Sequence, residues 1–309
     1  MSKIALSVEK LTKIYSSNKK KVSSLKALNN LSFEVKQGEV FGLLGPNGAG
    51  KTTFLSILAG TVIKTEGKVN VWGFDLDANP RQVRASIGIV PQEVNLDAFF
   101  TPKKLLELQA GLYGIPKKDR ITDIILKMVA LEKQANSYSR SLSGGMKRRL
   151  LIAKAMVHQP PILVLDEPTA GVDVELRKNL WDNVKALNKE GVTIILTTHY
   201  LFEAQEMCDR IAIINKGNLV ALDTTQKLLD RIQTKKIIFK VSKASDEQLS
   251  LDGVQFNIDN PNTISVLYEK NSCKFDDIIN CIKSKNIEII DIATEEGDLE
   301  DVFVQLTNN

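Results

Sequence analysis

The chain has 309 residues, of which 43% are hydrophobic and 25% are charged, and its net charge is only +4. These values are typical of a globular protein and exclude a polytopic membrane protein, a collagen and a mostly disordered chain. This charge is too small to argue for a nucleic-acid partner by itself, and we expect none. Cys208, Cys273 and Cys281 lack CxxC spacing, which argues against a zinc site or a disulfide scaffold and favours a reduced, cytoplasmic setting.

Apolar segments long enough to insert into a membrane are missing from the sequence. A spanning helix needs roughly 20 apolar residues, whereas even the longest uninterrupted apolar runs here are short, such as Ile162–Leu165. Residues 1–13 show no signal-peptide core. We therefore expect any work at a membrane to be done through a partner.

Short apolar strands alternate with helices through the first 225 residues. Strands are predicted at 4–8, 31–35, 40–44, 68–72, 87–90, 162–165, 192–196 and 211–214. Helices are predicted at 51–59, after Ser143, at 175–189 and at 200–208. Continuous apolar strands that alternate with helices are typical of a parallel sheet covered on both faces, so we expect an α/β fold.

Two further regions have patterns of their own. From Thr101 to about Tyr138 the periodicity is helical, with predicted apolar faces Leu105, Leu108, Leu112 and then Ile121, Ile124, Ile125, Met128, Val129. From about residue 235 onward, strands at 237–241, 263–267 and 287–292 accompany helices at 274–284 and 298–306. This last stretch is typical of a small α+β appendage.

A phosphate-binding loop is the strongest single motif. Gly45-Pro46-Asn47-Gly48-Ala49-Gly50-Lys51-Thr52 matches GxxxxGK[ST], and Thr53 follows. The motif lies between an apolar strand and a helix, so its backbone N–H groups and the helix N-terminus favour a bound phosphate. Lys51 supplies a charge for the β- and γ-phosphates, and the Thr52 hydroxyl is suited to Mg²⁺.

A pair of carboxylates follows a buried strand. Asp166 and Glu167 come directly after the apolar run 162–165, and ligands of parallel sheets bind at the carboxyl ends of strands. Asp166 is predicted to hold Mg²⁺ through water, and Glu167 to polarise the attacking water. A strand that simply ends in a solvated Asp-Glu turn is the alternative interpretation.

The pentapeptide Leu142-Ser143-Gly144-Gly145-Met146 precedes a basic, apolar helix. Ser143 is suited to cap this helix, and the two glycines leave its N–H groups uncovered. The segment is either an ordinary helix cap or a second phosphate-binding device. A single γ-phosphate does not need two such devices from one chain. An attractive hypothesis is therefore that two chains each contribute one half of a shared phosphate site.

The order of these motifs resembles the ATP-binding subunit of ABC transporters, over about residues 4–225. Residues 45–53 resemble the Walker A motif, 142–146 the signature and 162–167 Walker B. Single positions are similar to the adenine-stacking aromatic (Tyr15), the Q-loop (Gln92), the D-loop (Asp173) and the switch histidine (His199).

Finer detail resembles the type-2 exporters, the drug and polysaccharide efflux group (DrrA- and CcmA-like), with the bacterial YadG type as the nearest likeness. The segments Ser143–Leu150, Pro168–Arg177 and Asp298–Phe303 carry this resemblance. Two departures are visible. Met146 stands where many relatives have glutamine. The loop after Tyr15, which carries Lys19-Lys20-Lys21, looks a few residues longer than the family pattern.

The resemblance implies a fold and a domain division. The fold is an α/β P-loop NTPase with an antiparallel β subdomain, an inserted helical subdomain and a small C-terminal α+β appendage. The nucleotide-binding domain is expected at 1–225, with its helical subdomain at about 93–158. An accessory domain is expected at 226–309.

The resemblance also implies ATP hydrolysis with Mg²⁺. Glu167 is the implied general base, and His199, Lys51 and Gln92 are the other implied catalytic residues. The implied metal ligands are Thr52, Gln92 and Asp166. The implied nucleotide-binding residues are Tyr15, Gly45, Pro46, Asn47, Gly48, Ala49, Gly50, Lys51, Thr52, Thr53, Ser143, Gly144, Gly145 and Asp173.

The implied partners are a second copy of the chain, which completes an ATP sandwich, and a separate integral-membrane permease. The implied location is the cytoplasmic face of the inner or plasma membrane. Val94, Leu96, Phe99 and Phe100 are either a partner surface or core packing. Lys19–Lys21 is either a solvated loop or a contact for lipid headgroups.

Three rival functions use the same phosphate loop. A ribosome-associated ABC ATPase would show a second cassette joined by a charged linker, and a DNA-repair ABC ATPase would show a sustained heptad run. The sequence has neither feature. A nucleotide kinase would need neither LSGGM nor the Asp166-Glu167 pair. An importer subunit is the nearest alternative, and the C-terminal tail favours an exporter.

Overall fold

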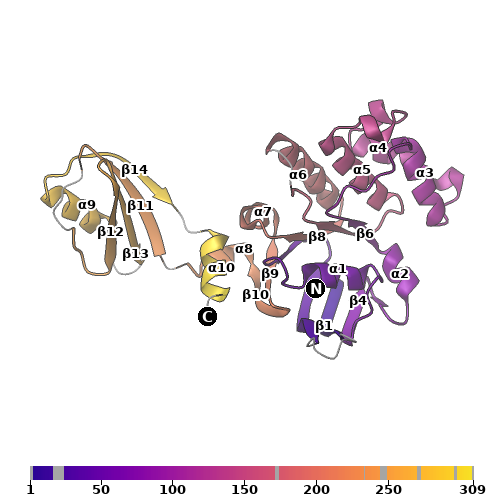
Figure 1. Ribbon diagram of the computed structural model, residues 1–309, viewed down its shortest axis with the longest axis horizontal. Coiled ribbons are helices and arrows are strands. Elements are labelled where there is room, and N and C mark those ends of the chain that lie inside the picture. Colours follow the sequence, from indigo (N-terminus) through magenta and orange to yellow (C-terminus); the bar gives the residue numbers. More distant parts are fainter. Residues whose placement is uncertain are drawn as a thin grey trace. The chain divides into compact units, whose positions relative to one another are not determined.

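The computed structural model describes residues 3–16, 24–170, 174–232, 234–243, 249–269, 273–295 and 298–307. The chain divides into two compact units, Met1–Thr224 and Thr225–Asn309 (Figure 1). The sequence places the corresponding boundary at 225. Among the described helices, none combines the length and the apolar character needed to cross a bilayer.

A six-stranded sheet forms the centre of the first unit, in the order β10-β9-β3-β8-β7-β6. Its strands are β3 (Val40–Leu44), β6 (Ile87–Val90), β7 (Ile162–Asp166), β8 (Thr193–Thr198), β9 (Arg210–Asn215) and β10 (Asn218–Thr224). The pairs β6/β7, β7/β8, β8/β3 and β3/β9 are parallel, which confirms the predicted parallel sheet. The sequence reading missed β10, which pairs antiparallel with β9 at the edge.

A second, antiparallel sheet has the order β2-β1-β4-β5. It comprises β1 (Ile4–Tyr15), β2 (Leu25–Lys36), β4 (Glu66–Val71) and β5 (Phe74–Asp75). Strands β1 and β2 are longer than predicted, because bulges in their pairing interrupt the apolar alternation without ending the ladder. This sheet confirms the expected antiparallel β subdomain.

Helix α1 (Lys51–Leu58) packs between the two sheets. Phe33 of β2 stacks on Phe41 of β3 with ring centroids 5.4 Å apart, and it also meets Phe54 of α1 at 5.5 Å. All three rings are buried. This aromatic contact fixes the start of α1, and therefore the phosphate loop before it, against both sheets.

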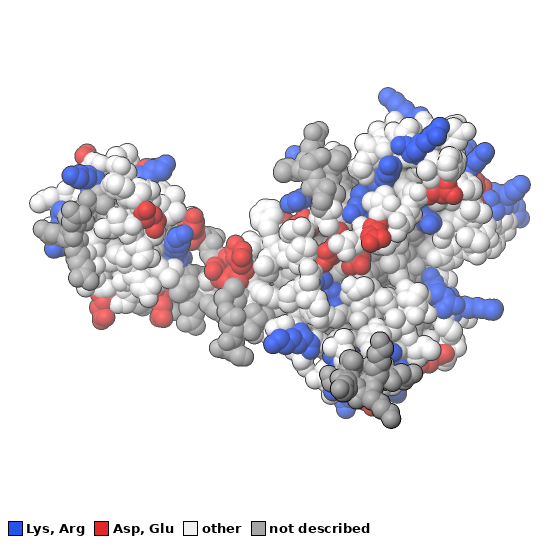
Figure 2. Space-filling model, in the orientation of Figure 1, with Lys and Arg blue, Asp and Glu red and all other residues white. Residues whose placement is uncertain are grey.

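The remaining helices of the first unit are α2 (Pro80–Ala85), α3 (Pro102–Leu112), α4 (Thr122–Met128), α5 (Gly144–Met156), α6 (Val174–Lys189) and α7 (Leu201–Met207). Short 3-10 turns cover Lys117–Asp119, Glu132–Gln134 and Ser139–Ser141. Helices α3, α4 and α5 pack on one another and form the inserted helical region (Figure 1). In Figure 2, Lys and Arg side chains gather over this region.

The predicted apolar faces of the helical region are partly wrong. Leu105 is buried, but Leu108 and Leu112 are exposed. The buried face of α3 follows four-residue spacing through Pro102, Leu106 and Ala110 instead. Ile125 of α4 and Val129, directly after this helix, are buried as predicted, whereas Ile124 is exposed. A helix with leucines on two sides has two candidate stripes, and packing against neighbouring helices decides between them.

The second unit is an α+β fold, as predicted. Its antiparallel sheet has the order β12-β13-β11-β14, with β11 (Thr234–Val241), β12 (Val254–Asn260), β13 (Thr263–Glu269) and β14 (Ile289–Glu295). Ile278 and Ile282 of α9 (Phe275–Ser284) pack on Phe239 and Val266 of the sheet. Helices α8 (Thr225–Leu229) and α10 (Leu299–Thr307) contact each other. The sequence reading missed β12 because its polar residues weaken the strand pattern.

Candidate functional site

The phosphate loop connects β3 to α1 and is shaped by its glycines. Gly50 has φ +110°, and a Cβ atom there would lie 2.6 Å from the carbonyl oxygen of Ala27. At Gly45 a Cβ atom would lie 2.3 Å from the carbonyl oxygen of Ile214. Only glycine fits either position. The loop is therefore a tight turn that ends at the N-terminus of α1, where backbone N–H groups favour an anion.

Lys51, the first residue of α1, is only 5% exposed. Its ammonium group donates hydrogen bonds to the carbonyl oxygens of Gly45 at 2.6 Å and Pro46 at 3.2 Å. It also lies 3.6 Å from a carboxylate oxygen of Glu167. Burial lowers the pKa of Lys51, and the nearby carboxylates of Glu167 and Asp166 oppose that shift. The charge of Lys51 is thus held inside the loop, where a phosphate would bind.

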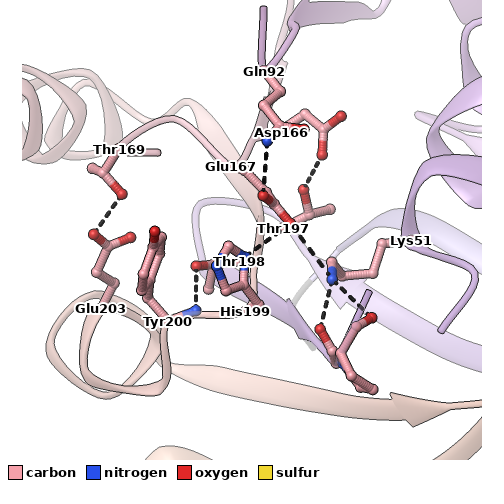
Figure 3. Close-up of polar contacts among 12 residues, drawn as sticks. Lys51, Gln92, Asp166, Glu167, Thr169, Thr197, Thr198, His199, Tyr200 and Glu203 are labelled. Carbon is pink, nitrogen blue, oxygen red and sulfur yellow. Dashed lines mark hydrogen bonds and ion pairs between the residues drawn. The ribbon is translucent and has the colours of Figure 1, made fainter. Parts of the chain in front are cut away.

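Glu167 is the centre of the polar cluster drawn in Figure 3 and is 7% exposed. Three groups surround its carboxylate. The Gln92 amide donates to Oε2 at 3.1 Å, His199 Nδ1 lies 3.1 Å from Oε1, and Lys51 Nζ lies 3.6 Å from the same oxygen. These residues come from the segments after β6 and β8 and from α1, so the carboxyl ends of the parallel strands bring them together.

The backbone at Glu167 is unusual, since its φ of +42° lies in the left-handed region that non-glycine residues rarely adopt. Its N–H donates to the carbonyl of Thr197 at 2.9 Å, and its own carbonyl accepts from the Ala170 N–H at 3.2 Å. Such strain persists only where surrounding contacts hold it, and it is concentrated at functional sites.

Asp166 ends β7 and accepts a hydrogen bond from the Thr197 hydroxyl at 2.6 Å. Burial raises the pKa of its carboxyl, and the Thr197 hydrogen bond opposes the shift. The residues expected to hold Mg²⁺ therefore offer a carboxylate, an amide oxygen (Gln92) and a hydroxyl (Thr52). These are the hard oxygen ligands that Mg²⁺ prefers, so the donor set fits the ion.

A cavity of about 740 Å³ opens at the phosphate loop. Its lining combines the loop with residues from six other segments: Tyr15, Leu25, Lys26, Ala27, Pro46, Asn47, Gly48, Gly50, Lys51, Thr52, Thr53, Gln92, Glu167, Ala170, His199, Tyr200 and Lys216. The cavity thus gathers most of the predicted nucleotide-binding residues. Gly45, Ala49 and Asp166 are not among the lining residues.

Tyr15 lies at one side of this cavity and its ring is partly exposed. The Lys13 ammonium sits 4.8 Å from the centre of the ring. An accessible aromatic face beside a cation is suited to stack on a flat heterocycle. The predicted role of Tyr15 stays a prediction.

The predicted signature residues lie elsewhere. Ser143, Gly144 and Gly145 do not line the cavity, and the Ser143 hydroxyl caps α5 by accepting from the Met146 N–H at 3.3 Å. The helix-capping interpretation of this pentapeptide is therefore confirmed. Whether it also binds a phosphate of another chain stays a prediction. Asp173 and Lys19–Lys21 lie outside the described residues.

Two residues of interest have positions that no sequence motif indicates. Lys216, in the turn between β9 and β10, lines the cavity but belongs to no motif. Arg148 of α5 is buried, and its guanidinium donates to the carbonyls of Pro91 at 3.3 Å and Ala170 at 3.4 Å. It thereby ties α5 to the segments that carry Gln92 and Glu167. Local sequence gives no signal for either role, because both depend on long-range packing.

Comparison with known families and proteins gives a consistent result. A family model described as "ABC transporter" matches residues 28–170. The linearmycin resistance ATP-binding protein LnrL of Bacillus subtilis (strain 168) is 33% identical over 91% of this chain and 93% of its own length. A Nod factor export ATP-binding protein I of Rhizobium sp. (strain N33) is 40% identical over 74% of each chain.

Solved structures agree with the sequence relatives. CbiO1 from Clostridium perfringens, described as part of the ABC transporter complex cbiONQ, superposes with a TM-score of 0.66 at 27% identity, over 74% of this chain and 91% of its own. A dimeric post-hydrolysis structure of the ATP-binding cassette MJ0796 with ADP and Pi gives 0.62 at 28% identity, over 71% and 98%.

Proposed function

This chain belongs to the family of ABC transporter ATP-binding proteins, and from that premise we propose that it hydrolyses ATP to power a membrane exporter. The observation that carries the proposal is the convergence of Lys51, Gln92 and His199 on Glu167, beside the phosphate loop. Curated relatives named for linearmycin resistance and Nod factor export support the direction of transport.

Nucleotide binding is proposed to use both ends of the cavity. The phosphates lie in the loop 45–53, where backbone N–H groups and Lys51 neutralise their charge. Tyr15 stacks on adenine at the other side. The Lys51 ammonium also contacts the carbonyl oxygens of Gly45 and Pro46, so a bound phosphate would share this group with the loop backbone.

Hydrolysis is proposed to centre on Glu167 as general base. Its carboxylate takes a proton from the attacking water, and Gln92 and His199 hold the carboxylate and the water in place. His199 also stabilises the charge that develops on the γ-phosphate. Thr52, Gln92 and Asp166 would hold Mg²⁺, which supplies charge neutralisation on the phosphate oxygens.

Two copies of the chain are proposed to enclose each nucleotide. Ser143, Gly144, Gly145 and Asp173 of one copy then complete the cavity of the other. The proposal is supported by the lining of the cavity, which does not include Ser143, Gly144 or Gly145 of the same chain. Cassette relatives described as dimeric are consistent with this assembly.

The membrane partner is proposed to be a separate permease, which holds this chain at the cytoplasmic face of the membrane. A groove of about 450 Å³ beside the Gln92 segment is lined by Pro91, Asn95, Gln109, Tyr113 and Leu151, among others. A short helix of the permease is the proposed occupant. Phe99, which is 74% exposed in the segment after Gln92, is a candidate for additional contact.

The test compares wild-type chain, Glu167→Gln and a control, Glu190→Gln, which makes the same substitution at an exposed site outside the cavity. ATP turnover and molar mass are measured with and without ATP and Mg²⁺. We expect Glu167→Gln to lose turnover and to accumulate as an ATP-held dimer, while Glu190→Gln matches the wild type. Full turnover in Glu167→Gln would contradict the assigned base, and a monomer with ATP bound would contradict the composite site.

Transport itself is tested after reconstitution with the membrane subunit in vesicles. ATP-dependent movement of substrate away from the side that carries this chain supports export. Movement toward that side would identify an importer subunit instead.

A further inference from the structure

Glu203 is a buried acid that lies outside the cavity described above. It belongs to α7, the helix that begins two residues after His199, and its exposure is only 2%. Its carboxylate accepts a hydrogen bond from the Thr169 hydroxyl (Figure 3). The Nε atom of Arg177, on α6, lies 3.4 Å from the same carboxylate oxygen.

The contact between Glu203 and Thr169 joins the two segments that carry the polar cluster. Thr169 follows Glu167 by two residues, and Glu203 follows His199 by four. On the other side of the cluster, the Glu167 N–H is bonded to the Thr197 carbonyl. The turn that holds Glu167 is therefore fixed to the His199 segment at two points, one through the backbone and one through the side chain of Glu203.

Two observations indicate that the hydrogen bond between Thr169 and Glu203 has a role beyond packing. Glu167 has a strained backbone, and a strained residue keeps its conformation only when the residues around it are held in place. In addition, Glu203 Oε2 is buried and has no hydrogen-bond partner among the described residues. A carboxylate that is incompletely bonded in the interior costs stability, so packing alone would favour an apolar residue at this position.

We infer that Glu203 is a positioning residue for ATP hydrolysis: through Thr169 it holds the turn after Glu167, and so keeps the Glu167 carboxylate in place against His199. The inference rests on the proposed role of Glu167. Glu203 does not line the cavity, so it acts through Thr169 and does not touch nucleotide. Its loss is therefore expected to affect turnover rather than ATP binding.

The test is a double-mutant cycle in the full-length chain with Glu203→Ala, Thr169→Val and both together. We expect each single variant to lower kcat by about 10- to 100-fold, a size typical of displaced catalytic groups, with KM within about 2-fold of wild type. The double variant is expected to be no slower than the worse single one, because both remove the same contact. Thr169→Ser retains the hydroxyl and is expected to recover most of the lost turnover.

Glu206→Gln is the matched control, because Glu206 is an exposed acid on the same helix. Thermal unfolding of every variant shows whether the fold is intact, and Thr169→Val is nearly isosteric, which keeps the test valid if Glu203→Ala unfolds. Normal kcat in Thr169→Val, fully multiplicative losses in the double variant, or a fall in ATP affinity that equals the fall in kcat would each overturn the inference. A wild-type chain without turnover would overturn the proposed function itself.

Discussion

The two units of the chain treat charged residues in opposite ways. The first unit buries Lys51, Arg148, Glu167 and Glu203. In the second unit, Ser265 is the only buried polar residue among those described, and its charges form exposed pairs such as Lys236–Glu295 at 2.8 Å, with side chains 45% and 54% exposed. A buried charge costs free energy that a surface charge does not. Lys51, Arg148, Glu167 and Glu203 lie in or beside the polar cluster of the first unit, whereas the described part of the second unit buries no charged residue.

The largest expected effect concerns the central buried acid. Glu167→Gln is expected to lower kcat by about 10²- to 10⁴-fold, the contribution typical of a general base. Removing an exposed acid of the second unit, in Glu295→Gln, is expected to leave kcat unchanged. Steady-state ATPase assays of the two variants measure the contrast directly. Equal losses in both would show that buried and exposed acids do not differ in the way proposed.

The core of the second unit provides the next largest effect. Phe239 is fully buried between the sheet and α9, so Phe239→Ala is expected to cost about 3–5 kcal/mol of that unit's stability. Chemical denaturation, monitored by limited proteolysis of the second unit, measures this loss of stability. If the first unit contains all the chemistry, kcat should remain within about 2-fold of wild type. A collapse of kcat in a variant that still binds ATP would assign a catalytic role to the second unit.

A smaller effect tests whether a buried charge at the site opposes stability. Burial raises the pKa of Asp166 above its ordinary value of 3.8. At a pH between the ordinary pKa of an unfolded aspartate and the higher pKa in the native state, the native state holds a proton that the unfolded state has released. The free energy of unfolding therefore decreases as the pH rises through this interval. Asp166→Asn is expected to raise Tm at pH 7 and to lower ATPase activity.

The pH dependence supplies the control for this prediction. Below pH 3.8 the carboxyl of Asp166 is protonated in both states, so the Tm advantage of Asp166→Asn should disappear as the pH falls toward that value. Differential scanning calorimetry between pH 4 and 7 measures the trend. A variant less stable than wild type at pH 7 would show that the Thr197 hydrogen bond outweighs the cost of burial.

The smallest expected effect concerns the surface pairs of the second unit. Lys236 and Glu295 pair across β11 and β14 with exposed side chains, so Lys236→Gln is expected to change stability by about 0–1 kcal/mol. Urea denaturation at low and high salt measures this, and the difference should shrink at high salt. A loss of several kcal/mol would mean that the pair is not the ordinary surface contact described.

Much of the first unit was predictable because its patterns are local. The phosphate loop, the apolar run before Asp166 and the serine cap of α5 each depend on fewer than a dozen neighbouring residues, and each is found where the sequence places it. Prediction failed where local pattern was ambiguous or weak. Two leucine stripes competed on α3, and polar residues concealed β12 in the second unit.

By itself, the sequence determined most of the order of elements, the parallel sheet, the phosphate loop and the family, because hydrophobic period and glycine spacing act over short distances. The tertiary structure alone decided which side chains meet. Gln92 and Glu167 are 75 positions apart, and Thr169 and Glu203 are 34 apart. Their contacts, and the burial of Arg148 and Glu203, arise only when strands and helices pack, since burial and pairing belong to the assembled core and not to any local segment.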